Sequence, residues 1–148
     1  MLKLPPPVWA LIYVLAGAAA SWALGWPRPG GLWLPPLGMA LVLLGLIPPL
    51  WAIGLFRREG TQINPTSETN SKLVTRGPFS FTRNPMYLGL TIEALGVAFW
   101  VGAWPMFLAP LAVFATANWV HIPFEEAKMR RQFPTEFDVY ATRVRRWL

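Results

Sequence analysis

Residues 86–120, MYLGLTIEALGVAFWVGAWPMFLAPLAVFATANWV, decide the predicted fold. Glu93 is the only Asp, Glu, Lys or Arg among them. A helix of about 20 apolar residues crosses the hydrocarbon core of a bilayer, which is about 30 Å thick. We therefore expect one transmembrane helix over residues 86–104 and a second over residues 105–120. The turn between them is so short that they should form an antiparallel hairpin.

Two further apolar stretches precede this hairpin, over residues 8–26 and 32–56. The first ends at Gly25-Trp26-Pro27, where a signal peptide would have a small-residue cleavage site, so we expect a retained span. The sequence thus predicts an all-α integral membrane protein with about four transmembrane helices. We expect one domain over residues 1–148.

Small residues and prolines predict where these first two helices pack and bend. Gly17, Ser21 and Gly25 lie four residues apart, and such a stripe lets another helix approach closely, within the monomer or across a dimer. Pro48 and Pro49 lack backbone donors and clash with the preceding turn. We therefore expect the second helix to kink or break at these prolines.

The composition excludes an ordinary water-soluble domain. Of the 148 residues, 54% are apolar and 14% are charged, whereas soluble domains have roughly 25% charged residues. The chain has no Cys, which excludes disulfides, thiolate metal sites and a Cys nucleophile. It has one His, so a multi-His metal site is impossible without other ligands. We expect no metal.

The net charge of +6 raises the question of nucleic-acid binding, but the positions of the charges favour membrane topology instead. Four spans place the N-terminus, the loop 57–85 and the tail 121–148 on one side. Cytosolic segments of membrane proteins are enriched in Lys and Arg. The opposite side holds only Arg28, so we expect the loop and tail to be cytosolic, in a bacterial cytoplasmic membrane, beside anionic lipid and not nucleic acid. Twelve of the 13 basic residues lie on the cytosolic side: Lys3, Arg57, Arg58, Lys72, Arg76, Arg83, Lys128, Arg130, Arg131, Arg143, Arg145 and Arg146.

The first segment polar enough for chemistry is the loop GTQINPTSETNSKLVTRGPFSFTRNPMYLG, residues 60–89. Pro85 suits the first position of the helix that follows. The unpaired N–H groups and the positive dipole end of that helix, next to Arg83, suit a carboxylate or a phosphate. Alternatively, Arg83 and Tyr87 are ordinary interfacial anchors.

The second polar segment is the tail HIPFEEAKMRRQFPTEFDVYATRVRRWL, residues 121–148. Glu125 and Glu126 point about 100° apart on a helix, so one can face a site while the other faces water or an Arg. His121 shares the face of Glu125 if the helix continues that far, although Pro123 can offset the register. Alternatively, these acids are solvated and the His is interfacial.

The run LVTRGPFSFTRNPMYLG, followed after a hairpin by Glu125-Glu126, then Phe133, a Tyr and a basic end, resembles the isoprenylcysteine carboxyl methyltransferase family. Relatives of that family include the phospholipid N-methyltransferases. The resemblance covers residues 61–148. It implies an integral membrane enzyme that uses S-adenosylmethionine, with the C-terminal helical segment closing the cofactor site at the cytosolic face. A lipid-like or small hydrophobic acceptor would enter from the bilayer.

The resemblance also implies roles for individual residues. Arg83 and Glu125 would be catalytic, with Glu125 near the methyl group or the acceptor. His121 falls where eukaryotic members have a substrate-contacting Arg, so His121 and Glu125 would bind the substrate. Arg83 to Tyr87 match the motif Arg-His-Pro-x-Tyr. The cofactor would be held by Asn64, Ser71, Lys72, Leu73, Val74, Phe79, Asn84, Pro85, Met86 and Tyr87.

Three residues depart from the family pattern. Asn84 replaces the motif His and cannot titrate near neutral pH. His121 replaces an Arg and lacks its bidentate fork. Phe133-Pro134 stands where Phe-Gly is usual. The departures favour methyl transfer at a membrane face over the prenylcysteine substrate itself.

The predicted function is therefore transfer of a methyl group from S-adenosylmethionine to a hydrophobic or amphipathic carboxylate, amine or thiol. One alternative is an NADPH-dependent membrane reductase of the sterol reductase type. Another is a non-catalytic membrane scaffold or a small transporter. Within the spans, Glu93 is a functional candidate by default, but we expect a structural role, against Asn118 or reaching Arg83 or water. Asn118 would then join helices by hydrogen bonding.

Overall fold

The computed structural model describes residues 4–60 and 72–148, and this part of the chain is built from helices without a β-strand. The predicted all-α class is confirmed. In chain order the elements are α1 (Pro6–Ala23), α2 (Pro35–Glu59), the 3-10 turn η1 (Gly77–Ser80), α3 (Pro85–Val101), the 3-10 turn η2 (Trp104–Phe107), α4 (Leu108–Thr116), the π-helical turn η3 (Ala117–His121), α5 (Ile122–Gln132) and α6 (Pro134–Arg143).

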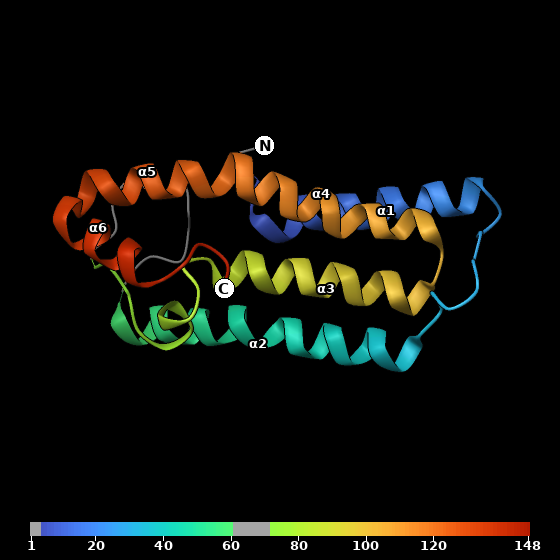
Figure 1. Ribbon diagram of the computed structural model, residues 1–148, viewed down its shortest axis with the longest axis horizontal. Helices are drawn as coiled ribbons and strands as arrows, with labels where there is room; N and C mark the ends of the chain where they lie inside the picture. The colour runs from blue at the N-terminus through green and yellow to red at the C-terminus, as the bar shows by residue number, and fades with distance from the viewer. Residues whose placement is uncertain (1–3, 61–71) are drawn as a thin grey trace.

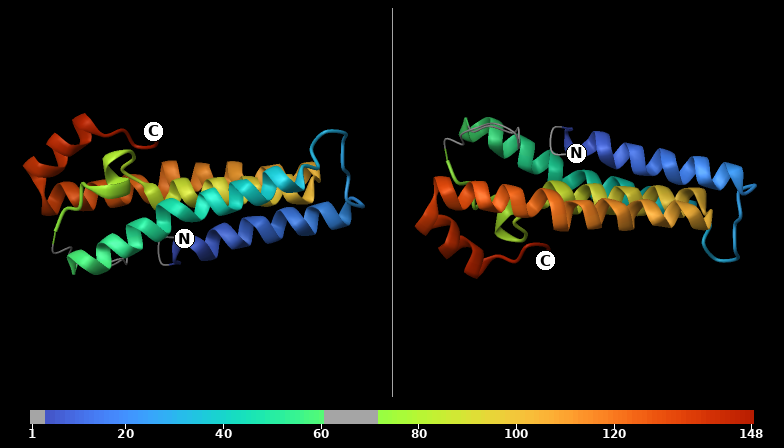
Figure 2. Two further views of the ribbon diagram at one scale, coloured as in Figure 1. Left: turned by 90° about the horizontal axis from the view of Figure 1, so that it is seen from below. Right: turned by 90° about the horizontal axis from the view of Figure 1, so that it is seen from above.

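Four long apolar helical segments lie lengthwise in one elongated bundle (Figure 1). Three of them are long and apolar enough to cross a membrane, namely α1, α2 and the continuous segment Trp104–Gln132. The fourth, α3, is apolar but has 17 residues. The short η1, the helix α6 and the C-terminus gather at the end of the bundle where α2 finishes (Figure 2).

The predicted antiparallel hairpin is formed by α3 and the segment that begins at η2. Its turn lies slightly earlier than expected, because Gly102 ends α3 with a φ of +73°. A Cβ atom at Gly102 would also lie 2.6 Å from Cβ of Trp33. Gly102 therefore has two reasons to be glycine. Its backbone is left-handed, and the loop between α1 and α2, which carries Trp33, packs closely against it.

Glycines bring α2 and α3 into close contact, which the sequence analysis missed. A Cβ atom on Gly38 would lie 2.6 Å from the carbonyl oxygen of Gly96, and one on Gly89 would lie 2.5 Å from that of Gly45. Such contacts require small residues at the helix interface. Glu93 also faces α2, since its Cγ would lie 2.7 Å from a Cβ at Gly45. The alternatives expected for Glu93, packing against Asn118 or reaching Arg83 or water, stay predictions.

The predicted small-residue stripe of α1 packs within this chain over two of its three positions. Gly17 lies against η2, where a Cβ would be 3.4 Å from Cα of Met106. Ser21 is fully buried and its hydroxyl donates to the Gly17 carbonyl. Gly25 follows the end of α1 with a φ of +71° and touches nothing within 4 Å of its Cβ position.

Helix α2 continues through Pro48 and Pro49, so the predicted break is absent. The ring of Pro49 occupies the space that Gly89 leaves open, since its Cδ would lie 2.5 Å from a Cβ there. The neighbouring helix thus accommodates the bulk of the proline ring.

The last long helix does not end near Val120 as predicted, but passes through the π-helical turn η3 into α5. Pro123 has no N–H to bond the carbonyl four residues earlier. A π turn accommodates one extra residue and pairs its carbonyls one position further along the chain. The π turn therefore allows the helix to continue past Pro123. It also changes the angle between the side chains of His121 and Glu125 from the one that a regular α-helix would give.

Candidate active site

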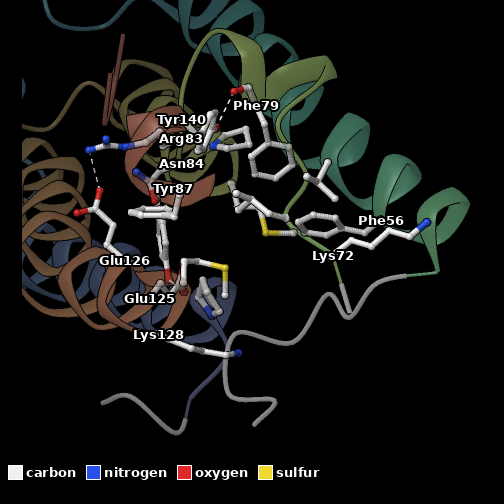
Figure 3. Close-up of a pocket in the computed structure, with 17 residues that line it drawn as sticks. Phe56, Lys72, Phe79, Arg83, Asn84, Tyr87, Glu125, Glu126, Lys128 and Tyr140 are labelled. Atoms are coloured by element: carbon white, nitrogen blue, oxygen red, sulfur yellow. Dashed lines mark hydrogen bonds and ion pairs between the residues drawn. The ribbon is translucent and has the colours of Figure 1, made fainter. Parts of the chain in front are cut away.

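A cavity opens at the end of the bundle where α6 lies, and ten of the thirteen predicted site residues line it (Figure 3). Asn64 and Ser71 lie outside the described residues. His121 does not line the cavity. The ten are Lys72, Leu73, Val74, Phe79, Arg83, Asn84, Pro85, Met86, Tyr87 and Glu125.

Tyr87 and Glu125 connect the two predicted polar segments. Tyr87 lies in the first turn of α3 and is 3% exposed. Its hydroxyl donates a hydrogen bond of 2.5 Å to Oε1 of Glu125 in α5. Hydrogen bonds to a carboxylate are shorter and stronger than those between neutral groups. This bond fixes one carboxylate oxygen at the cavity wall.

Glu126 points away from Glu125, as the helical angle predicts, and binds two arginines. Nη2 of Arg83 lies 2.9 Å from its Oε1, and Nη2 of Arg146 lies 2.7 Å from its Oε2. The side chains of Arg83 and Glu126 are only 13% and 8% exposed. Nη1 of Arg83 also donates to the Ala141 carbonyl. Most of the Arg83 guanidinium is therefore engaged with α5 and α6.

Residues 144–148, here called the C-terminal strap, return from α6 to the start of α3 (Figure 1). The N–H of Arg83 donates to the Arg145 carbonyl over 3.0 Å. The Arg146 carbonyl accepts hydrogen bonds from the Thr82 hydroxyl and from Nδ2 of Asn84, over 3.2 and 2.9 Å. The side chain of Asn84, which replaces the family's His, therefore holds the strap.

The strap also changes the partner predicted for Asn118. Nε1 of Trp147 donates to Oδ1 of Asn118 over 3.1 Å, and the Trp147 ring stacks on Phe114 with a centroid separation of 4.7 Å. Asn118 thus joins the last long helix to the strap. Neither Arg146 nor Trp147 was predicted to lie at the site, because long-range folding brings both residues there.

His121 is buried among aromatic rings, next to Tyr87. Its ring centroid is 4.9 Å from that of Trp9 and 5.9 Å from that of Tyr87. The residue is 4% exposed, and Nε2 has no hydrogen-bond partner among the described residues. The predicted contact of His121 with a substrate stays a prediction.

Two residues of α6 complete the cavity and were not predicted, although their spacing of three residues is typical of one helix face. Phe137 and Tyr140 are buried and line the cavity. The Tyr140 hydroxyl donates to the Phe79 carbonyl over 2.7 Å. Burial raises the pKa of Tyr140 above its ordinary value, although Arg83 acts in the opposite direction. The phenol therefore remains a neutral donor and fixes η1 to α6.

The family model for phospholipid methyltransferase matches residues 34–136. The chain belongs to this family. The resemblance seen in the sequence is thereby confirmed, and the matched region includes the candidate site from α2 to the start of α6. It ends before the C-terminal strap, so Arg146 lies outside the part that this phospholipid methyltransferase family member shares with the family model, whereas its partners Asn84 and Glu126 lie inside that part.

Two curated proteins resemble this family member. Protein-S-isoprenylcysteine O-methyltransferase B of Arabidopsis thaliana is 31% identical over 119 residues, which cover 76% of this chain and 57% of the relative. Cobalt-zinc-cadmium resistance protein CzcN of Cupriavidus metallidurans is 31% identical over 141 residues, which cover 93% and 60%. The chain thus spans less than two thirds of the length of either relative. No solved structure matches the chain significantly.

The expectation that the site holds no metal stays a prediction. Within residues 4–60 and 72–148, no group of three or more His, Cys, Asp or Glu side chains is arranged to hold one. The chemistry available is that of apolar walls, two carboxylates, two phenols and several cations.

Proposed function

We propose that the protein is a membrane methyltransferase that transfers a methyl group from S-adenosylmethionine to a hydrophobic or amphipathic acceptor. The observation that carries this proposal is the cavity in which Tyr87 and Glu125 meet. Its lining comes from the same loop and helix that the methyltransferase resemblance singles out, and the chain belongs to the phospholipid methyltransferase family.

The lining suits an adenosine attached to a charged amino acid. Phe56 and Phe79, with ring centroids 5.2 Å apart, offer an apolar wall for a flat base, and Figure 3 shows Tyr87, Glu125 and Lys128 across the cavity from them. The ammonium group of Lys128 can pair with the carboxylate of the amino-acid part. When bound, S-adenosylmethionine supplies an electrophilic methyl group on a sulfonium sulfur.

An unpaired donor at the cavity supports this assignment. Nε of Arg83, a lining residue, is buried and has no hydrogen-bond partner among the described residues. Buried donors without a partner are costly in a folded protein. We infer that an oxygen of the bound cofactor or acceptor pairs with it, while the rest of the guanidinium positions α5 and α6.

The contribution of the protein to methyl transfer is mainly alignment. Holding two reactants in line can lower a barrier by about 7 to 11 kcal/mol. Tyr87 fixes the carboxylate of Glu125, which would orient a cationic or hydrogen-bonding group beside the transferred methyl. A carboxylate acceptor needs no base, whereas an amine or thiol acceptor would pass its proton to Glu125. All three acceptor classes fit this scheme.

The membrane setting supports an acceptor that arrives from the bilayer. The cavity is lined by Pro6 at the start of α1 and by Phe56 near the end of α2, both in helices apolar enough to span. The relative from Arabidopsis thaliana is named as an isoprenylcysteine methyltransferase, and a prenyl group is lipid-like. Arg57 and Arg58 follow Phe56 in the last turn of α2, and two basic residues at that end of a span support a cytosolic site.

Calorimetry on the full chain in detergent tests the proposal. S-adenosylmethionine and its demethylated product, S-adenosylhomocysteine, should each bind saturably with a stoichiometry of about one. A Phe79→Ala variant should bind about 5- to 150-fold more weakly, because about 1–3 kcal/mol of base stacking is lost. Saturable binding of NADPH without binding of either sulfur nucleoside would overturn the proposal and favour the reductase alternative.

A further inference from the structure

The C-terminal strap is held by contacts with two parts of the protein, the last long helix and residues 82–84. Trp147 holds it against the last long helix through Asn118 and Phe114. The Arg145 carbonyl accepts from the N–H of Arg83, and the Arg146 carbonyl accepts from two side chains of residues 82–84. The strap therefore fixes the backbone that directly precedes α3.

The side chain of Arg146 adds a second connection. It donates to both oxygens of Glu126, from Nη2 over 2.7 Å and from Nε over 3.3 Å. A carboxylate bound through both oxygens to a guanidinium has a fixed plane. Because Oε1 also accepts from Arg83, the orientation set by Arg146 determines where the Arg83 guanidinium lies.

The two connections converge on the motif that enters the proposed site. Arg83 and Asn84 both line the cavity, and Pro85 then begins the helix that carries Tyr87. Glu126 is adjacent to Glu125 in α5, so a turn of α5 that displaces one carboxylate displaces the other. The strap thus contacts the residues on either side of the Tyr87–Glu125 hydrogen bond without lining the cavity itself.

We propose that Arg146 is a positioning residue: through Glu126 it holds Arg83 and α5 in the arrangement that the bound nucleoside requires, so the C-terminal strap is part of the site. This inference rests on the proposed methyltransferase function. It assigns a role to a segment that follows the region shared with the family model.

Arg146→Ala, Arg146→Lys and Arg145→Ala test the role of the side chain. Arg145 is the matched control, because it is an exposed arginine of the same strap and the Ala variant keeps its hydrogen-bonded carbonyl. We expect Arg146→Ala to weaken S-adenosylhomocysteine binding about tenfold or more, the loss of a hydrogen bond to a charged group. Arg146→Lys should fall between Ala and wild type, since Lys keeps the charge but lacks the fork. Arg145→Ala should bind within about twofold of wild type on the same scale.

Hydrogen exchange at the amides of Arg83 and Asn84 separates this inference from the proposed function. We expect faster exchange there in Arg146→Ala than in Arg145→Ala, at a temperature where circular dichroism shows both folded. Wild-type affinity together with wild-type exchange in Arg146→Ala would overturn the positioning role. If the wild type binds no sulfur nucleoside, the proposed function fails, and the exchange comparison alone decides whether Arg146 holds the motif. If Arg146→Ala does not fold, Arg146→Gln takes its place in both measurements.

Discussion

The hydroxyl of Tyr87 donates a 2.5 Å hydrogen bond to Oε1 of Glu125, which joins the first turn of α3 to α5 at the wall of the candidate cavity. The two residues are 38 positions apart in the chain. One belongs to the loop motif and the other to the pair of carboxylates, so the bond unites the two segments singled out by sequence.

Removal of the Tyr87 hydroxyl should impair methyl transfer more than it impairs folding. We expect Tyr87→Phe to lower the rate between about tenfold and a hundredfold, because a hydrogen bond to a charged group is worth roughly 1.5–3 kcal/mol. Transfer of a radiolabelled methyl group to extracted lipids measures the rate. Tyr13→Phe is the control, since Tyr13 bonds Thr116 away from the cavity. Equal losses in both variants would contradict a special role for Tyr87.

Neutralising Glu125 should lower the rate of methyl transfer more than removal of the Tyr87 hydroxyl does. Glu125→Gln keeps the shape but removes the charge that would orient or deprotonate the acceptor, and we expect a loss of about a hundredfold or more in kcat. Glu136→Gln, which removes an exposed carboxylate from α6, should leave kcat unchanged. If the Glu125→Gln variant retains full kcat with every acceptor that the wild type methylates, the carboxylate has no catalytic part.

The ion pairs of Glu126 with Arg83 and Arg146 should contribute more to the free energy of unfolding than an exposed ion pair does. Glu126→Ala leaves the Arg83 guanidinium, whose side chain is 13% exposed, without its carboxylate, and breaking a buried pair costs about 3–5 kcal/mol. Asp138→Ala breaks an exposed pair with Arg130 and should cost less than about 1 kcal/mol. Thermal unfolding in one detergent compares them. Similar unfolding temperatures for the two variants would show that the buried cluster adds no stability.

Close packing of α2 on α3 predicts sensitivity to single methyl groups. Gly89→Ala would place Cβ 2.5 Å from the Gly45 carbonyl oxygen, and overpacking of this kind costs about 1–3 kcal/mol. Gly54→Ala is the control on α2, because nothing lies within 4 Å of its Cβ position. Unfolding in detergent should begin at a lower temperature for Gly89→Ala only. An unchanged Gly89→Ala variant would mean that the helices separate easily in the folded protein.

The absence of Cys makes the orientation directly testable. Arg28, in the loop between α1 and α2, and Arg143, the last residue of α6, are both exposed. The α1–α2 loop and α6 lie toward opposite ends of the bundle (Figure 2). A membrane-impermeant maleimide added to intact cells should label Arg28→Cys, whereas Arg143→Cys should react only after the membrane is opened. The reverse pattern would place the candidate site on the outer face and contradict the topology drawn from the basic residues.

The sequence was sufficient for the helical class, the hairpin and most of the cavity lining, because apolar length and the loop motif are local signals. It was not sufficient for Phe137, Tyr140, Arg146 and Trp147, whose contacts depend on how α6 folds back. It also failed to predict the glycine contacts of α2, since small residues pack against a partner that only the fold identifies. The register of His121 relative to Glu125 was left open in the sequence, because Pro123 can offset it, and the structure shows a π turn directly before Pro123.

The length of the continuous helical segment Trp104–Gln132 sets the distance of the candidate site from the opposite end of the bundle. Its 29 residues are about 43 Å long at 1.5 Å per residue, whereas the hydrocarbon core is about 30 Å thick. Both carboxylates lie near its far end, so their depth is set by the number of residues that precede them. One alanine inserted into α4 would raise Glu125 by about 1.5 Å and turn it about 100° away from Tyr87. In this protein, helix length determines at what depth and in which direction the candidate site faces the acceptor.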